Sequence, residues 1–214
     1  MSVQTGRIAP LGPEGVPSGF VKQSRTDAVK VNLLNLDGDE QADLSVHGGF
    51  EKAVYGYAAS HYPAWAAEFP ELAPAFVGGA MGENLTISGL DEGMICVGDI
   101  HAIGSTLLQV CQPRQPCFKF ALRHTNRRLP RAMVKAGRAG WYYRVVREGV
   151  VRAGDAVSLH DRLHPNFAFS RLVQIVYHGG ATREELEQLA TMNSLAGQWR
   201  EAARLQLVNP ERDE

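Results

Sequence analysis

Short stretches of alternating hydrophobic and polar residues fill roughly the first 160 residues of the chain, and this alternation is the period of a half-buried β-strand. Turn-forming pairs such as Asp37-Gly38 and Gly154-Asp155 separate the stretches. Many short strands with few helices are typical of barrels, so we expect a mainly β (α+β) fold with a closed or nearly closed β-barrel. The predicted strands are 28–34, 84–87, 95–103, 106–111, 142–147 and 156–160.

Two helices are predicted to interrupt the strands. In 61–69, Tyr62, Trp65 and Phe69 recur at helical spacing, and Pro70 ends the segment. The segment 129–136 is the second predicted helix. Both are expected to turn an apolar face toward the core.

After Pro165 the hydrophobic period changes from that of strands to that of helices. Ser170 is expected to cap a first helix through about residue 177, and Thr182 with Glu185 forms a capping box for a second helix through about residue 192. Apolar residues at three-to-four spacing around 195–205 predict a third helix. We expect few contacts between this three-helix module and the barrel. The predicted domains are 1–165 and 166–214.

Composition indicates an ordinary folded protein. Of 214 residues, 44% are hydrophobic and 21% are charged, close to the averages of about 45–50% and 25% for globular proteins. No apolar run reaches the ~20 residues of a membrane span, and residues 1–10 lack a signal-peptide pattern. Three cysteines are too few for a disulfide scaffold. We therefore expect a cytoplasmic protein without a membrane partner.

Charge is unevenly distributed along the chain. The formal net charge is −1, yet residues 100–147 contain ten Lys or Arg and no Asp or Glu. Such a segment creates a local positive field that favours binding of an anion. The alternative is a solvated basic face whose carboxylate partners come from other segments.

Cys117 is the strongest candidate for chemistry. It lies between Pro113 and Pro116 on one side and Lys119 on the other, with Arg114 close by. Nearby cations favour the thiolate, the form that acts as nucleophile or metal ligand. The alternative is a buried, inert cysteine, which is the interpretation that we favour for Cys96 and Cys111.

Two glycine-containing motifs are weaker candidates. His47-Gly48-Gly49 can present backbone N–H groups to a phosphate or oxyanion, with His47 as a donor or proton relay. The alternative is a glycine hairpin with a surface histidine. Glu83-Asn84, after a turn, can recognise the donor and acceptor edge of a heterocycle, although a glutamate there is often simply exposed.

Taken together, these motifs closely resemble the MOSC domain family, named after the C-terminal domain of molybdenum cofactor sulfurases. The likeness extends over nearly the whole chain, because short bacterial members also carry a C-terminal three-helix module. In order along the sequence, the motifs are LDGDEQAD (36–43), VHGG (46–49), HY (61–62), GENL (82–85), VGD (97–99) and PRQPC (113–117).

The resemblance implies a MOSC-type β-barrel that binds a molybdenum cofactor (Mo-molybdopterin), with Cys117 as the metal ligand. It implies the reduction of small N-hydroxylated compounds, such as hydroxylamino base analogues. The chain has no flavin or haem motif, so electrons are expected from a separate protein of the flavin or iron–sulfur type. The expected cofactor-binding residues are His47, Gly48, Gly49, Glu83, Asn84, Arg114 and Lys119.

Two other functions remain open at this point. A sulfur carrier would hold a persulfide on Cys117 and pass sulfur to a metal centre, using the same acidic thiol. A non-enzymatic module would bind nucleic acid through the basic segment, with strongly salt-dependent affinity. The acidic remainder of the chain argues against nucleic acid as a partner.

Overall fold

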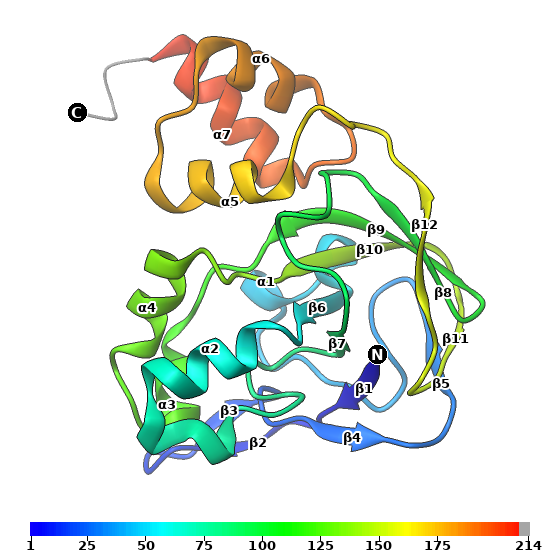
Figure 1. Ribbon diagram of the computed structural model, residues 1–214, viewed down its shortest axis with the longest axis vertical. Coiled ribbons are helices and arrows are strands. Elements are labelled where there is room, and N and C mark those ends of the chain that lie inside the picture. The colour runs from blue at the N-terminus through cyan, green and yellow to red at the C-terminus, as the bar shows by residue number, and fades with distance from the viewer. Residues whose placement is uncertain (210–214) are drawn as a thin grey trace.

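The structure, a computed structural model, describes residues 1–209. Its centre is one mixed sheet of eight strands that curls into a half-barrel, with helices outside it (Figure 1). The prediction of an α+β fold is confirmed, although helices account for 32% of the structure and strands for 26%, so the fold is not mainly β. In spatial order the strands are β12 (Val157–Asp161), β8 (Ile100–Ile103), β9 (Thr106–Pro113), β10 (Trp141–Arg147), β6 (Val54–Ala58), β7 (Leu85–Ile87), β1 (Ser2–Thr5) and β4 (Gln23–Arg25).

The strand pairing explains why the barrel stays open. Within residues 1–209, β12 and β4 are the two edges of the large sheet and do not pair with each other. Every pair of neighbours in this sheet is antiparallel except β6 and β7, which run parallel. Two small antiparallel sheets accompany it. They are β11 (Gly149–Val151) with β5 (Val29–Val31), and β2 (Ala9–Leu11) with β3 (Val16–Ser18).

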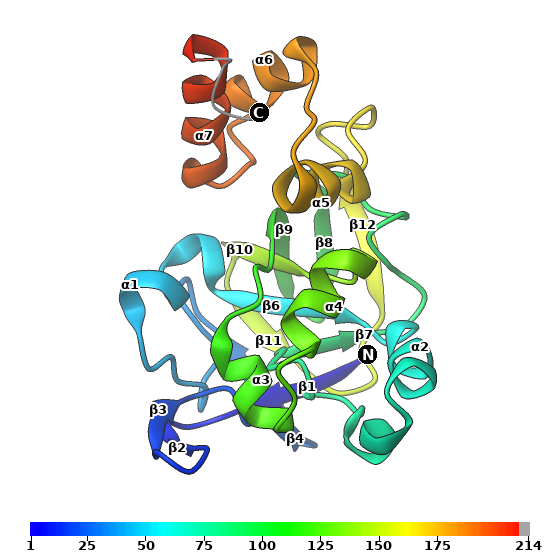
Figure 2. The same cartoon turned by 90° about the vertical axis from the view of Figure 1, so that its left-hand side faces the viewer.

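Helices lie at one end of the sheet and around its sides. Figure 2 shows α5, α6 and α7 at one end of the molecule, and α3 and α4 in front of the strands. The helices are α1 (Leu44–His47), α2 (His61–Glu68), α3 (Phe118–His124), α4 (Leu129–Ala136), α5 (Phe169–His178), α6 (Arg183–Thr191) and α7 (Gly197–Val208). Two 3₁₀ helices, η1 (Phe50–Lys52) and η2 (Pro70–Ala75), follow α1 and α2.

The central strands have a hydrophobic core on each face. Side chains alternate between the faces of a strand, and in β6 Val54 and Ala58 join one core while Tyr55 and Tyr57 join the other. The second core is rich in aromatic residues and lies between the sheet and α2, α3 and α4. Because β6 is buried on both faces, its sequence lacks the alternation by which half-buried strands are recognised.

Most predicted elements are observed, with shifts at their ends. The predicted helix 61–69 is α2, and 129–136 coincides with α4. The predicted strand 95–103 is observed only as β8, because Gly98, at φ +82°, turns the chain and Asp99 N donates to Cys96 O. The capping box of Thr182 and Glu185 is confirmed. The expected cap at Ser170 is wrong: α5 begins at Phe169, and Ser170 N donates to Glu92 O.

The C-terminal helices share the core of the barrel. Phe169, Leu172 and Leu195 belong to the same buried cluster as Val110 and Trp141 of the sheet. The expectation that few contacts cross residue 165 is therefore wrong, while the domain boundary itself stays a prediction. Over residues 1–209, the helices are all too short or too polar to cross a membrane.

Candidate active site

Cys117 lies where β9 gives way to α3. Pro113 ends the strand, Pro116 restricts the linker, and Cys117 is the N-cap residue of α3 with extended backbone angles (φ −111°, ψ 169°). Its side chain is partly exposed and lines a pocket that opens to solvent.

Opposing effects act on the thiol of Cys117. Burial raises its pKa, but a hydrogen bond from the His47 side chain and the positive charge of Arg114 outweigh burial and lower the pKa to about 6. The thiolate therefore predominates at neutral pH. Burial instead raises the pKa of Cys96, and raises that of Cys111 to about 12. These two thiols are inert core groups, in agreement with the sequence analysis.

Arg114 is a buried cation without a carboxylate partner. It is 6% exposed, its Nη1 donates to Tyr142 Oη at 3.1 Å, and its guanidinium lies 4.8 Å from the centroid of the Tyr55 ring. The described residues 1–209 supply no salt bridge to it. Burying a charge unpaired is costly, so Arg114 is suited to an anion that enters the pocket.

Three lysines complete a cationic lining. Lys22, with a 5% exposed side chain, pairs with Asp39. Burial lowers the pKa of Lys22, and Asp39 opposes that effect. Lys52 Nζ donates to Val46 O at 2.6 Å, and Lys119 Nζ donates to Pro17 O at 2.9 Å. The full lining is Ser18, Gly19, Phe20, Lys22, Asp39, Glu40, Gln41, Ala42, His47, Lys52, Tyr55, Gly82, Asn84, Arg114, Cys117, Lys119 and Tyr142.

The structure brings His47, Arg114, Cys117 and Lys119 together in this pocket, and the motif glycines lie outside the lining. Gly49 has a φ of +87°, which favours glycine. A Cβ on Gly48 would lie 2.8 Å from Leu44 Cδ2. These glycines therefore shape the loop that carries His47, and a contact between them and a cofactor stays a prediction.

Glu83 is also placed differently from the expectation. It is fully buried, does not line the pocket, and accepts hydrogen bonds from Gly79 N, Met81 N, Thr86 Oγ1 and Tyr62 Oη. Its carboxylate thus stabilises the turn before β7. The expectation that Glu83 contacts a cofactor is corrected, because the residue has a structural role. Asn84 does reach the pocket, although its Oδ1 accepts from Tyr55 N at 3.0 Å.

Several lining residues were not predicted from the sequence. Lys22, Asp39 and Lys52 come from three separate segments, and Tyr55 and Tyr142 belong to apolar strands. Their distance from Cys117 along the sequence does not indicate that any of them lines the pocket. Asp39 lies inside the LDGDEQAD motif, so that motif was the one available pointer. Within residues 1–209, no group of three or more His, Cys, Asp and Glu side chains is placed to hold a metal ion.

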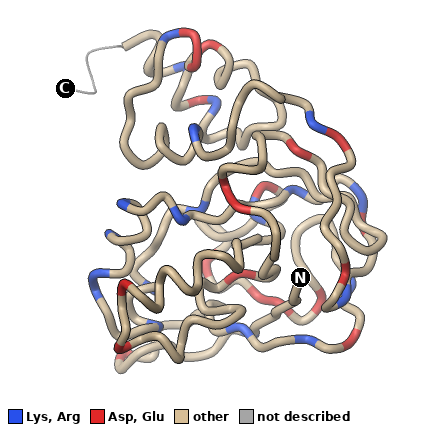
Figure 3. The backbone as a smooth tube through the Cα atoms, in the orientation of Figure 1, with Lys and Arg blue, Asp and Glu red and all other residues tan. Residues whose placement is uncertain are grey.

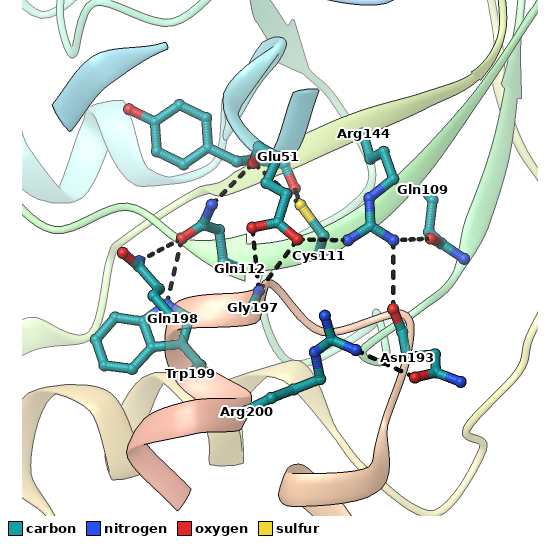
Figure 4. A network of polar contacts seen from close by, with 11 residues as sticks. Glu51, Gln109, Cys111, Gln112, Arg144, Asn193, Gly197, Gln198, Trp199 and Arg200 are labelled. Atoms are coloured by element: carbon teal, nitrogen blue, oxygen red, sulfur yellow. Dashed lines mark hydrogen bonds and ion pairs between the residues drawn. The ribbon is translucent and has the colours of Figure 1, made fainter. Parts of the chain in front are cut away.

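A network of polar contacts ties the site to the C-terminal helices, and Glu51 is its centre (Figure 4). The Glu51 carboxylate accepts from Arg144 Nη2 at 2.8 Å and from Gly197 N at 3.0 and 3.1 Å, at the first residue of α7. The Glu51 carbonyl accepts from Cys111 Sγ and from Gln112 Nε2. Since η1 follows the His47 loop, α7 helps to fix the segment that positions His47.

A second contact links α5 to the pocket. Tyr177 Oη donates to the backbone carbonyl of Arg114, and burial raises the pKa of Tyr177, which keeps its phenol protonated at neutral pH. The C-terminal helices therefore contact both segments that contribute to the site. The helix α7 contacts Glu51, which follows the His47 loop, and α5 contacts Arg114, which precedes Cys117.

The sequence and the fold match a known family. The MOSC domain family model matches residues 43–158. The chain is 36% identical over 199 residues to Protein YiiM of Escherichia coli (strain K12), covering 93% of this chain and 88% of that protein. YiiM from Geobacillus stearothermophilus has a crystal structure that superposes with a TM-score of 0.81 at 30% identity, over 96% of this chain and 97% of the other. The chain belongs to the MOSC domain family.

A longer relative contains the same kind of unit. A protein of Gibberella moniliformis (strain M3125 / FGSC 7600), named Reductase, is 37% identical over 179 residues. The match covers 82% of this chain but 32% of that protein. Most of the longer protein therefore consists of segments outside this match.

Proposed function

We propose that the protein is a molybdenum-cofactor-dependent reductase of N-hydroxylated compounds that receives its electrons from a separate protein. The observation that carries the proposal is the Cys117 thiolate beside Arg114, a buried cation without a carboxylate partner among residues 1–209. Membership of the MOSC family and the name Reductase of the longer relative support an oxidoreductase role. This chain corresponds to only about a third of the length of that relative. The relative therefore has further segments that this chain lacks, which agrees with an electron source outside the present chain.

The residues of the pocket fit a molybdenum cofactor. A thiolate is a soft ligand that suits molybdenum, and Cys117 is the thiolate that the pocket offers. The pterin carries a phosphate, and cations are its preferred partners. Arg114, Lys22, Lys52 and Lys119 line the same pocket.

The reaction takes up two electrons and two protons, converts a hydroxylamino group to an amine, and releases water. When bound, the molybdenum cofactor supplies two-electron oxygen-transfer chemistry. His47 donates a hydrogen bond to Cys117 and so holds the sulfur as thiolate. Arg114 and the pocket lysines orient the anionic group. Tyr55 and Tyr142, both buried, form an aromatic wall that limits access of water.

Metal analysis tests this function. The protein is purified anaerobically from a molybdenum-replete host, and molybdenum, pterin and reduction of a hydroxylamino purine are measured. We expect near-stoichiometric molybdenum and activity in the wild type, and loss of both in Cys117→Ser. The matched control is Cys96→Ser, which removes a buried thiol away from the pocket and is expected to keep both.

The same experiment addresses the sulfur-carrier alternative. An acidic, partly exposed thiol also suits a persulfide, and Cys117 has both properties. Intact-protein mass spectrometry detects a persulfide as one added sulfur that dithiothreitol removes. A persulfide on Cys117 together with absence of molybdenum from wild-type protein would overturn the proposed function.

A further inference from the structure

Four cations on α3, on α4 and on the loop between these helices have no side-chain partner among residues 1–209. They are Arg123, Arg127, Arg131 and Lys135, all exposed, and we refer to them as the basic face. Figure 3 shows Lys and Arg positions along the left-hand edge of the molecule, where Figure 1 labels α3 and α4. The sequence left open that carboxylates from other segments neutralise the basic stretch. Such carboxylates pair with the neighbouring Arg128 and Arg138, but not with these four cations.

Those neighbours show how the local carboxylates are used. Arg128 pairs with Glu71 at 3.1 Å and lies over the Phe69 ring. Arg138 pairs with Glu68 at 3.0 Å and lies over the Trp65 ring. Glu68 of α2 and Glu71 of η2 are thus already paired. Within residues 1–209, the positive charge of the basic face therefore has no carboxylate that neutralises it.

The arrangement of the basic face opposes helix stability. Arg131 and Lys135 are four residues apart on α4, where like charges repel. An uncompensated cluster of this kind produces a directional positive potential that attracts an acidic surface. The rest of the chain is acidic and makes this positive potential more directional. Residues 1–99 contain 13 acidic and 5 basic residues, and residues 148–214 contain 10 acidic and 7 basic residues.

The position of the basic face relates it to electron delivery. The helix α3 begins directly after Cys117, so the face starts at the side of the pocket. Phe118, the next residue, is 61% exposed and adds an apolar contact between the thiol and the cations. Weak redox complexes use small interfaces of this kind, in which charge steers the encounter.

We propose that the basic face of α3 and α4, with Phe118 at its edge, is the docking surface for an acidic electron-donor protein. This inference rests on the proposed function, since it assigns a surface to the external donor. The donor binds with its acidic side against Arg123, Arg127, Arg131 and Lys135, and its redox group comes close to the pocket that contains Cys117.

The test uses reduced flavodoxin, a small acidic flavin protein, as the probe, and the holoprotein. The variant Arg127→Glu/Arg131→Glu reverses two charges of the face. The matched control, Lys30→Glu/Arg152→Glu, reverses two exposed cations that also lack side-chain partners within residues 1–209. These lie on β5 and directly after β11, on the opposite side of Figure 1. Both variants change the formal charge equally.

Two quantities are measured: the Kd for flavodoxin at low ionic strength, and turnover with flavodoxin or with dithionite, which needs no docking. We expect the face variant to bind flavodoxin about tenfold more weakly and with a smaller salt dependence, because two attractive contacts become repulsive. Turnover with dithionite should stay unchanged in both variants, and the control should bind like the wild type.

Several results would overturn the docking surface. They are equal binding losses in the face variant and the control, no binding of flavodoxin by the wild type, a parallel loss of dithionite turnover in the face variant, or tighter binding of single-stranded DNA than of flavodoxin at the same face. Failure of the proposed function is distinguishable. In that case wild-type protein lacks turnover with dithionite, while binding to flavodoxin is still measured separately.

Discussion

At the scale of single residues, burial and hydrogen bonding act in opposite directions on Cys117. Burial alone raises the pKa of a thiol, as it does for Cys111. His47 and Arg114 reverse the outcome at Cys117. The reactivity of this thiol therefore depends on two residues from different segments of the chain, and each makes a distinct contribution that a substitution can isolate.

The contribution of His47 is predicted to appear as a change in pH dependence. In cofactor-free protein, alkylation of Cys117 by iodoacetamide should be half-maximal near the pKa of about 6, because the thiolate is the form present above the pKa. His47→Ala removes the hydrogen bond and raises that pKa. We expect the alkylation rate at pH 7 to fall roughly tenfold, because most of the Cys117 side chain is then protonated.

The labelling is assigned to Cys117 by subtraction. The variant Cys117→Ser reports the residual alkylation of Cys96 and Cys111, whose raised pKa values keep them protonated at neutral pH. A pH profile of His47→Ala identical to that of the wild type contradicts the prediction.

Arg114 is predicted to lower the stability of the cofactor-free protein and to raise its affinity for phosphate. Arg114→Met keeps most of the side-chain volume and removes a buried charge that has no carboxylate partner within residues 1–209. The melting temperature of the cofactor-free variant should be equal to or higher than that of the wild type. Affinity for inorganic phosphate should fall by about one to two decades, since a charge-assisted contact is worth about 1.5–3 kcal/mol.

Calorimetry measures both quantities for Arg114→Met. Lys30→Met is the control, because Lys30 is an exposed cation outside the pocket and should leave phosphate affinity unchanged. Strong destabilisation with unchanged phosphate binding would show that Arg114 serves the fold instead.

The sequence identified the site residues unevenly. Cys117 and Arg114 stand in a short motif within an acid-free segment, so local spacing was sufficient to find them. Glu83 was misassigned because a carboxylate after a turn has the same local sequence whether it faces a ligand or four backbone and hydroxyl donors. Tyr55 and Tyr142 were missed because their role depends on which face of a doubly buried strand they occupy.

At the scale of elements, the first turn of α7 is capped by a residue far away in the sequence. Its N-cap residue, Ala196, has no side-chain capping bond. Glu51 instead accepts from Gly197 N and brings negative charge to the positive end of the helix dipole. The half-buried Arg144 completes the contact, with 20% and 21% side-chain exposure for Arg144 and Glu51.

Loss of the Glu51 charge is predicted to destabilise the protein. Glu51→Gln should lower the free energy of unfolding by about 1–2 kcal/mol, because one substitution weakens an ion pair and a helix cap. The control is Glu187→Gln, which removes an exposed ion pair with Arg183 and should cost less than about 0.5 kcal/mol. Urea denaturation measures both, and equal effects contradict the prediction.

Elements with local signals were the most predictable. The helix α4 and the capping box of α6 are specified by residues inside the element. The strands β1 to β4 were missed because each has only three or four residues, and β1 also obtains its hydrogen bonds from the distant strands β4 and β7. The helix α3 follows Pro116 and contains three basic residues, so its helical pattern was obscured.

At the scale of the whole molecule, the C-terminal helices share one of the two hydrophobic cores of the barrel. Trp141 contacts Phe169 with ring centroids 6.4 Å apart, and Leu172, Leu195 and Ala203 belong to the same cluster. We therefore expect truncation after residue 165 to remove part of the barrel core instead of leaving an independent domain.

The truncated chain, residues 1–165, is predicted to lose its fixed tertiary structure. Near-UV circular dichroism should weaken strongly, the urea transition should broaden, and an apolar dye should bind to the exposed core. The untruncated protein is the reference for all three measurements. A cooperative urea transition with a native near-UV spectrum would instead establish the barrel as a separate folding unit.

The order of contacts in the sheet also has a consequence for synthesis on the ribosome. The strand β1 pairs with β7, and the Met1 carbonyl accepts from Gly154 N at 2.8 Å. Glu51 is separated by 146 residues from Gly197. At about 5–20 residues per second, Glu51 emerges roughly 7–30 s before its partner is made. The nascent chain must therefore keep its early strands unaggregated for that time, and translation of α7 is the event that permits folding to finish.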